Sequence, residues 1–191
     1  MNKKTKLLAY TAMFTVINYV AFAYGKITIP VTAGTSTAIH IANAIVVLSA
    51  WFLGPLYGGL SGAIGLTIAD VLDPRYITSA PKTFLLKFLI GFIAGKVAQQ
   101  LKLQEKTDRK DIIMAAATSA IAGLGFNVVA DPIIGYLYRN YILGIPQEAA
   151  KIIAAWAAGA TAINAVACVF VSVILYLALY KNFLPRIPHH E

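Results

Sequence analysis

Residues 152–180 read IIAAWAAGATAINAVACVFVSVILYLALY and contain no charged side chain. A helix needs about 20 apolar residues to cross a hydrocarbon layer about 30 Å thick, and this stretch exceeds that length. Three other stretches, at 7–24, 27–69 and 112–130, are also uncharged if His40 is neutral. A soluble domain of this size has too small an interior to bury so much apolar surface. The chain is therefore predicted to be an integral membrane protein.

Glycine, proline and charged residues divide the apolar sequence into helices. Gly54-Pro55 splits a region too long for one span, and the two halves are predicted to be joined by a tight turn. Asp131-Pro132 is predicted to end or kink a helix, because the residue before proline disfavours the helical region. The fold class is thus an all-α integral membrane bundle of six transmembrane helices, forming a single transmembrane domain over residues 1–191. The predicted helices are 5–24, 38–53, 55–70, 81–100, 111–130 and 149–181.

The distribution of lysine and arginine predicts the orientation. Six spans place both termini on one side of the membrane. That side, with the segment 102–111, holds ten of the sixteen basic residues, whereas the opposite side holds five and Lys87 lies within a span. Because basic residues are enriched in cytoplasmic segments, both termini are predicted to be cytoplasmic. The net charge of +8 therefore indicates membrane orientation, and no nucleic-acid partner is expected.

The sequence does not favour an enzyme. Residues 59–62, GLSG, match the G-x-S-G pattern of intramembrane serine proteases, but such a protease needs a histidine base on a later helix. His40 precedes the motif, and the other histidines, at positions 189 and 190, follow the last apolar stretch. The sequence has no nucleotide-binding motif and no clustered metal ligands. No catalytic residue, cofactor or metal is predicted.

Polar and aromatic residues are concentrated in the half of the predicted bundle opposite the termini. Polar groups inside a membrane are costly and often functional. This asymmetry predicts a pocket open to the outside, not a polar path through the membrane. Each residue also has a structural alternative, such as a membrane-interface aromatic, a helix end or an interhelical hydrogen bond. The candidate substrate-binding residues are His40, Asn43, Tyr76, Lys82, Thr83, Lys87, Asn127, Asp131, Arg139, Trp156 and Asn164.

Small residues recur at a spacing of four along several predicted helices, as at Gly58 and Gly62. Such faces allow close helix contact in lipid. Packing within the bundle is the first interpretation, and docking onto a separate membrane subunit is the second.

A series of short motifs resembles a known family. The series consists of AIHIANA at 38–44, LGPLYGGL at 53–60, GAIG at 62–65, ADVL at 69–72, and APKTF at 80–84 followed by Lys87. It resembles the S components of energy-coupling factor (ECF) transporters, the vitamin-uptake systems of prokaryotes. The hydroxymethylpyrimidine/pyridoxine-type branch is the most similar.

This resemblance implies a substrate-binding subunit in the prokaryotic cell membrane. Its partners would be a transmembrane T component and two cytosolic ATPases, which would hydrolyse the ATP. The subunit would topple in the membrane to carry its closed pocket inward. Many S components dock through A-x-x-x-A in their first helix, but here Met13 stands four residues after Ala9. Docking is therefore expected to use Ala9 and Ala12, with Gly58 and Gly62.

The candidate site gives two predictions for the ligand. Lys82, Lys87 and Arg139 suit a carboxylate or phosphate, as in pantothenate. The histidine and asparagines suit a pyrimidine or pyridine ring, with an aromatic residue stacking on it. Pyridoxine or hydroxymethylpyrimidine is the preferred substrate class, and cobalamin is a further candidate. The alternative functions are a stand-alone secondary transporter or channel and a membrane scaffold without a ligand.

Overall fold

The structure is a computed structural model that describes residues 2–31 and 36–186, so positions 189 and 190 lie outside the described residues. Five helices in this part of the chain are long and apolar enough to cross a membrane. They are α1 (Lys3–Gly25), α2 (Ala42–Val71), α3 (Ala80–Gln100), α4 (Arg109–Leu137) and α5 (Gln147–Phe183).

Helix α2 is a helical hairpin that reverses at Gly54. This residue has φ 81° and ψ 171°, a conformation that glycine adopts without steric cost. A Cβ atom on Gly58 would lie 2.2 Å from Ala50 Cα, and one on Gly62 would lie 2.5 Å from Val46 Cγ1. Residues eight apart on a straight helix are separated by about 12 Å. The two halves therefore run antiparallel, and the glycines allow their close contact.

The predicted break at Gly54 is present, but the prediction of six spans is not confirmed. The halves 42–53 and 55–71 are about 18 Å and 25 Å long at 1.5 Å per residue, shorter than a hydrocarbon layer of about 30 Å. Five helices meet the length required for a span, and α2 is counted as one of them. The number of crossings made by α2 remains a prediction.

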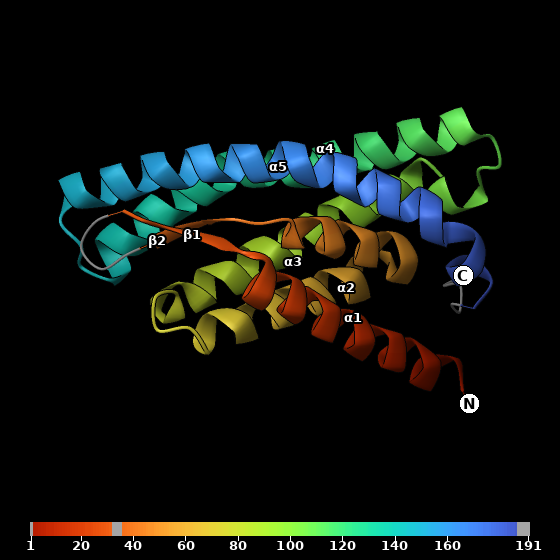
Figure 1. Cartoon of the computed structure of the whole chain (residues 1–191), viewed down its shortest axis with the longest axis horizontal. Helices are drawn as coiled ribbons and strands as arrows, with labels where there is room; N and C mark the ends of the chain where they lie inside the picture. Colours follow the sequence, from red (N-terminus) through yellow and green to blue (C-terminus); the bar gives the residue numbers. More distant parts are fainter. Residues whose placement is uncertain (1, 32–35, 187–191) are drawn as a thin grey trace.

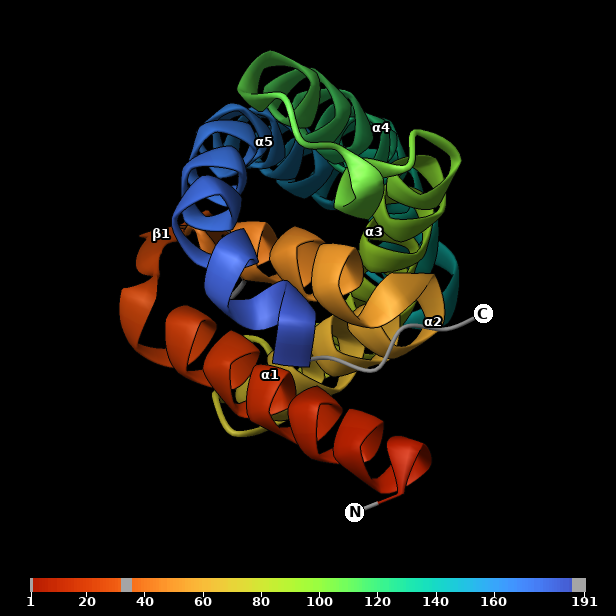
Figure 2. The ribbon, with the colours of Figure 1, turned by 90° about the vertical axis from the view of Figure 1, so that its right-hand side faces the viewer.

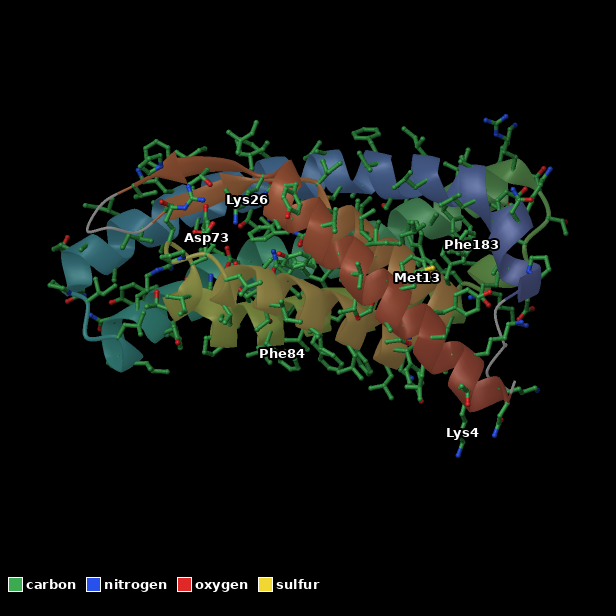
Figure 3. The ribbon with its side chains drawn as sticks, turned by 60° about the horizontal axis from the view of Figure 1, so that its bottom comes forward. Lys4, Met13, Lys26, Asp73, Phe84 and Phe183 are labelled. Atoms are coloured by element: carbon green, nitrogen blue, oxygen red, sulfur yellow. The ribbon has the colours of Figure 1, made fainter. Side chains whose placement is uncertain are left out.

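Helix α2 forms the centre of the bundle. In its most apolar 18-residue window 72% of residues are buried, against 22% in the windows of α1 and α5. It packs against α1, α3 and α5, and α4 packs against α3 and α5 (Figure 2). The outer helices expose large apolar side chains such as Val16, Val166 and Phe170, and Phe84 of α3 also points outward (Figure 3). A face of this kind is suited to contact with lipid.

A small β-hairpin lies between α1 and α2, where the sequence predicted a loop and the start of a helix at residue 38. Strands β1 (Ile27–Pro30) and β2 (Ser36–Ile39) pair antiparallel, with Ile27 opposite Ile39 and Pro30 opposite Ser36. The prediction of an all-α fold is therefore wrong in one respect: the mostly helical structure also contains a two-stranded sheet. The strands form because their threonine and isoleucine residues favour extended backbone and gain hydrogen bonds by pairing.

Helix α4 continues past Asp131-Pro132, so the predicted end of the helix there is wrong, while the alternative of a kink stays a prediction. It reaches Leu137 and is followed by a π-helical turn at Tyr138–Ile142. Proline removes one donor, so the carbonyl of Val128 loses its helical partner, but the neighbouring turns continue. The side chain of Asp131 also bonds to α3 and α5, which holds this part of the helix in place.

The connections collect at two opposite ends of the bundle. Both ends of the described chain, the turn at Gly54 and the segment between α3 and α4 lie at one end (Figure 1). The β-hairpin, the segment between α2 and α3 and the segment between α4 and α5 lie at the other (Figure 1). We call this second end the hairpin end. The arrangement agrees with the predicted placement of both termini on one side, while the identity of that side remains a prediction.

Candidate functional site

Two cavities lie at opposite ends of the bundle. The larger, of about 530 Å³, lies at the end with the termini and is lined by residues of the Gly54 turn and of the α3–α4 connection. Its charged residues, Lys102 and Glu105, are exposed and lie 3.8 Å from each other. Within the described parts of the chain, none of its lining side chains is a buried polar group without a hydrogen bond.

The smaller cavity, of about 90 Å³, lies at the hairpin end and has a different chemistry. Four of its lining residues, His40, Asn43, Asp70 and Arg139, each have a buried polar atom without a hydrogen-bond partner among the described residues. Buried polar groups are usually paired, so this concentration identifies the smaller cavity as the candidate binding site. The lining consists of Phe22, Ser36, Thr37, Ala38, His40, Asn43, Leu66, Asp70, Tyr76, Ser79, Lys82, Thr83, Leu86, Lys87, Asp131, Arg139, Ala157, Thr161 and Asn164.

Asp131 joins three helices at this cavity. Its Oδ1 accepts a hydrogen bond from Lys82 Nζ of α3 at 2.6 Å, and its Oδ2 accepts one from Thr161 Oγ1 of α5 at 2.8 Å. Both carboxylate oxygens are therefore used within the protein. The ammonium of Lys82 is likewise paired, so it acts first as a structural partner of Asp131.

Asn164 fastens the end of the β-hairpin to α5. Its Nδ2 donates to the carbonyl of Ala38 at 2.9 Å, and its Oδ1 accepts from the backbone N–H of His40 at 2.9 Å. The thiol of Cys168, one turn further along α5, contacts the carbonyl of His40 at 3.8 Å. The asparagine thus replaces backbone pairing at the point where β2 ends and α2 begins.

Contacts of Tyr76 and Lys26 lie beside the cavity and connect the residues around it. The Tyr76 hydroxyl bonds to Thr28 Oγ1 and to the carbonyl of Thr37, both at 3.2 Å. Lys26 Nζ lies 2.8 Å from Asp73 Oδ2 and 4.6 Å from the ring centroids of both Phe22 and Tyr76. The hairpin is therefore attached to the segment between α2 and α3 by a hydrogen-bonded tyrosine and an ion pair.

Two titratable groups outside the helices, Asp73 and His40, have pKa values that are lowered by their surroundings. Hydrogen bonds from Arg75 and Lys26 hold the pKa of the Asp73 carboxyl well below its usual range. Burial and the positive charge of Lys87 lower the pKa of His40 to about 3, and the ring of Phe22 packs edge-on at 4.8 Å. The imidazole is therefore neutral near pH 7, and it can donate one hydrogen bond and accept another.

Among residues 2–31 and 36–186, Arg139 and Lys87 are the cations of the site without an ion-pair partner. Arg139 is 7% exposed, and its Nη1 has no hydrogen-bond partner in the part of the chain that the structure describes. Lys87 forms no ion pair within residues 2–31 and 36–186. A Cβ atom on Gly135 would lie 2.8 Å from Arg139 Nη1, so the absence of a side chain there leaves room for the guanidinium.

The structure brings most of the predicted site residues together. Nine of the eleven line the cavity, and the exceptions are Trp156 and Asn127. Trp156 is 52% exposed and does not line the cavity, so its predicted role as a ring-stacking residue remains a prediction that this arrangement does not favour. Asn127 is buried but does not line the cavity, because it lies one helical turn before Asp131 along α4.

Several lining residues were missing from the predicted site. Asp70, the last residue of the predicted helix 55–70, is buried and accepts a hydrogen bond from Thr83 Oγ1 at 2.6 Å. Thr161 could have been found from its spacing, because it lies three residues before Asn164 on one face of α5. Ser36 and Thr37 line the cavity because they belong to the β-hairpin, and no periodic pattern in the sequence predicted that hairpin.

The residues predicted for partner docking have different surroundings. Ala9 and Ala12 are exposed on α1 and remain accessible. Gly58 and Gly62 are buried against the other half of α2, as the packing interpretation expects. In this conformation a partner subunit cannot reach these two glycines.

Comparisons with known proteins agree on the fold and the family. A structure described as the S-component for biotin from an ECF-type ABC transporter is similar with a TM-score of 0.64 and 20% identity, over 98% of both chains. A structure described as the S component of a bacterial ECF transporter has a TM-score of 0.58 and 18% identity, over 93% of this chain and 97% of that chain. No curated protein sequence matches the chain.

The profile of the family described as ECF-type riboflavin transporter, S component, matches residues 2–181. Such S components are membrane-embedded substrate-binding subunits for vitamin uptake and are not enzymes. The predicted resemblance is thus confirmed at the level of the S components, while the hydroxymethylpyrimidine/pyridoxine branch is not. Because the profile covers nearly the whole sequence, the chain belongs to the ECF-type riboflavin transporter S-component family.

Proposed function

We propose that this protein binds a small water-soluble vitamin or vitamin precursor at the hairpin end and carries it into the cell. The observation that carries the proposal is the group of buried, unpaired polar atoms around the smaller cavity. Groups of this kind are costly unless a ligand completes their hydrogen bonds. Riboflavin, biotin, pyridoxine, hydroxymethylpyrimidine, pantothenate and cobalamin are the candidate substrates.

The proposed transport step requires partners. Energy comes from two cytosolic ATPases coupled through a transmembrane T component, and the subunit topples to present its pocket to the cytoplasm. Docking uses the exposed face of α1 that contains Ala9 and Ala12. This proposal places the protein in the prokaryotic cell membrane, with both termini in the cytoplasm and the hairpin end outside.

The cavity is too small for a vitamin in this conformation, so binding requires the cavity to enlarge. Ligand sites usually measure about 300–1,000 Å³, whereas the cavity at the hairpin end measures about 90 Å³. A vitamin therefore enters only after the residues that cover the cavity move. Strand β2, moving together with its partner β1, is the proposed moving part, because Ser36, Thr37 and Ala38 line the cavity and the strand is bonded to Tyr76 and to Asn164 of α5 through side chains.

The test is binding and transport by the purified protein. Calorimetry with the six candidate vitamins should give saturable binding of at least one, in detergent and without partner proteins. Proteoliposomes should accumulate that vitamin only when the T component, both ATPases and ATP are present. Ion-driven uptake by the subunit alone would instead support a secondary transporter, and binding of none of the six would contradict the proposal.

A further inference from the structure

The polar groups of the smaller cavity fall into two sets. The first set is already used inside the protein: Lys82 and Thr161 bind Asp131, and both polar atoms of Asn164 bind backbone groups. These residues hold the cavity in shape and have little remaining capacity for a ligand. Asn164 already uses one donor and one acceptor to hold the hairpin, so among the predicted heterocycle-binding residues of this cavity His40 and Asn43 are the ones with unpaired buried atoms.

The second set consists of groups with unused capacity, and it includes neutral and negative groups as well as cations: His40 Nδ1, Asn43 Oδ1 and Asp70 Oδ1 have no hydrogen-bond partner among the described residues. The two cations of this set indicate the charge of the ligand. Arg139 has a buried Nη1 without an acceptor among the described residues, and Lys87 lines the same cavity without an ion-pair partner in that part of the chain. Guanidinium and ammonium groups are donors only, so the partner that completes them must be an acceptor. An anionic oxygen is the strongest acceptor for both.

The balance of charge around the cavity indicates how negative the acceptor is. Three cations, Lys82, Lys87 and Arg139, face two carboxylates, Asp70 and Asp131. Formally, one positive charge is left over in a site whose charged side chains are largely buried: Arg139 is 7% exposed and the side chain of Lys82 is 9% exposed. A buried charge is strongly disfavoured without a counter-charge, and one negative charge neutralises this site. A phosphate monoester, with a charge of about −1.5 to −2 near neutral pH, would exceed it.

We infer that the substrate is a vitamin with a single carboxylate group, which binds to Arg139 and Lys87. The inference rests on the proposed function and makes it more specific. It favours biotin or pantothenate over riboflavin, pyridoxine and hydroxymethylpyrimidine, which lack a carboxylate. Arg139 binds the carboxylate through its free Nη1, and Lys87 supplies the second positive charge from α3.

The first experiment compares ligands that differ in the carboxylate alone. Biotin is measured against biotinamide, and pantothenate against panthenol, by calorimetry on the wild-type protein. A charge-assisted hydrogen bond contributes about 1.5–3 kcal/mol, so the neutral analogue should bind roughly 10- to 150-fold more weakly. Because no substitution is involved, the result does not depend on the folding of a variant.

The second experiment assigns the residues. R139Q and K87M should each weaken binding of the carboxylate form and reduce the preference over its neutral analogue, whereas K87R should retain most of it. K151M is the control, because Lys151 also lies at the hairpin end but is exposed and paired with Glu148 at 2.9 Å. Melting temperatures of all variants in the same detergent report whether each one is folded.

The outcomes separate the inference from the proposed function. Tight binding of riboflavin, pyridoxine or hydroxymethylpyrimidine, or equal binding of a carboxylate and its neutral analogue, would overturn the inference and leave a vitamin-binding subunit. Tighter binding of pyridoxal phosphate than of any carboxylate would also overturn it. Binding of no compound from the whole panel would contradict both.

Discussion

Lys26 and Asp73 form a 2.8 Å ion pair that joins the residue after α1 to the segment after α2. Their side chains point toward one another across the hairpin end (Figure 3), and they are 7% and 14% exposed. The ammonium also lies 4.6 Å from the ring centroids of Phe22 and Tyr76. This pair therefore anchors the β-hairpin beside the cavity.

Substitution K26M should lower the stability of the protein. It removes a charged hydrogen bond worth about 1.5–3 kcal/mol, although Arg75 still pairs with Asp73. The melting temperature in detergent should fall for K26M and stay nearly constant for K151M, whose pair with Glu148 is exposed. Equal effects of the two substitutions would show that the Lys26 pair is not specially stabilising.

Substitution N164A should destabilise the attachment of the hairpin to α5. It leaves the N–H of His40 and the carbonyl of Ala38 without partners, at a cost of about 1–3 kcal/mol for each group that stays buried. W156A, on the exposed face of the same helix, should leave vitamin affinity unchanged. Calorimetry and melting curves of the two variants check this contrast, and a loss of affinity in W156A would contradict the placement of its ring.

Substitution G135A should separate stability from binding. Alanine favours a helix over glycine by about 1 kcal/mol, so the free energy of unfolding should not fall. The new methyl group would lie 2.8 Å from Arg139 Nη1, which forces the flexible guanidinium to shift. A weakened charged hydrogen bond predicts an affinity loss of less than roughly tenfold. Unchanged affinity measured by calorimetry would mean that Arg139 does not depend on this gap.

Stability should fall as the pH decreases from 7 to 5. The folded-state pKa of His40 is lowered to about 3, first by burial and then by the charge of Lys87, although Asp131 opposes this effect. The unfolded chain binds the proton near pH 6.5 and the folded protein does not, so the stabilisation is complete above pH 6.5 and is lost toward pH 3. This linkage is worth up to about 2 kcal/mol between pH 7 and 5.

The variant H40Q provides the control for this pH dependence. Glutamine does not titrate, so the melting temperature of H40Q should change less than that of wild type over the same pH range. Parallel changes in the two proteins would assign the pH dependence to other groups.

The sequence predicted the long helices well because a membrane imposes a simple rule on them. Helix α3 was expected at 81–100 and lies at Ala80–Gln100, and α5 was expected at 149–181 and lies at Gln147–Phe183. The turn at Gly54 was also predicted, since glycine and proline are adjacent there. In each case the local composition is sufficient.

The features that the sequence missed depend on contacts between distant residues. Each strand of the β-hairpin has only four residues and forms through pairing such as Ile27 with Ile39, which no local pattern reveals. The helix continues through Pro132 while Lys82 and Thr161 hold Asp131.

The candidate site was predicted mainly by the cost of polar groups in a membrane. That rule finds residues such as Lys87 and Asp131 but does not determine which way a side chain points. On α5, the buried stripe formed by Ala157, Thr161 and Asn164 follows helical spacing, and Trp156 lies about 100° away from it. Helical periodicity applied to this stripe would have excluded the tryptophan.

The reversal of α2 has a consequence for how its sequence can vary. The first arm, 42–53, is buried along almost its whole length, so its side chains contact other protein atoms and not lipid. Substitutions in this arm should be tolerated when they conserve the volume and shape of the side chain. A hydrophobic but larger side chain should destabilise the protein. The buried centre of this membrane protein is therefore under the same steric selection as the interior of a water-soluble one.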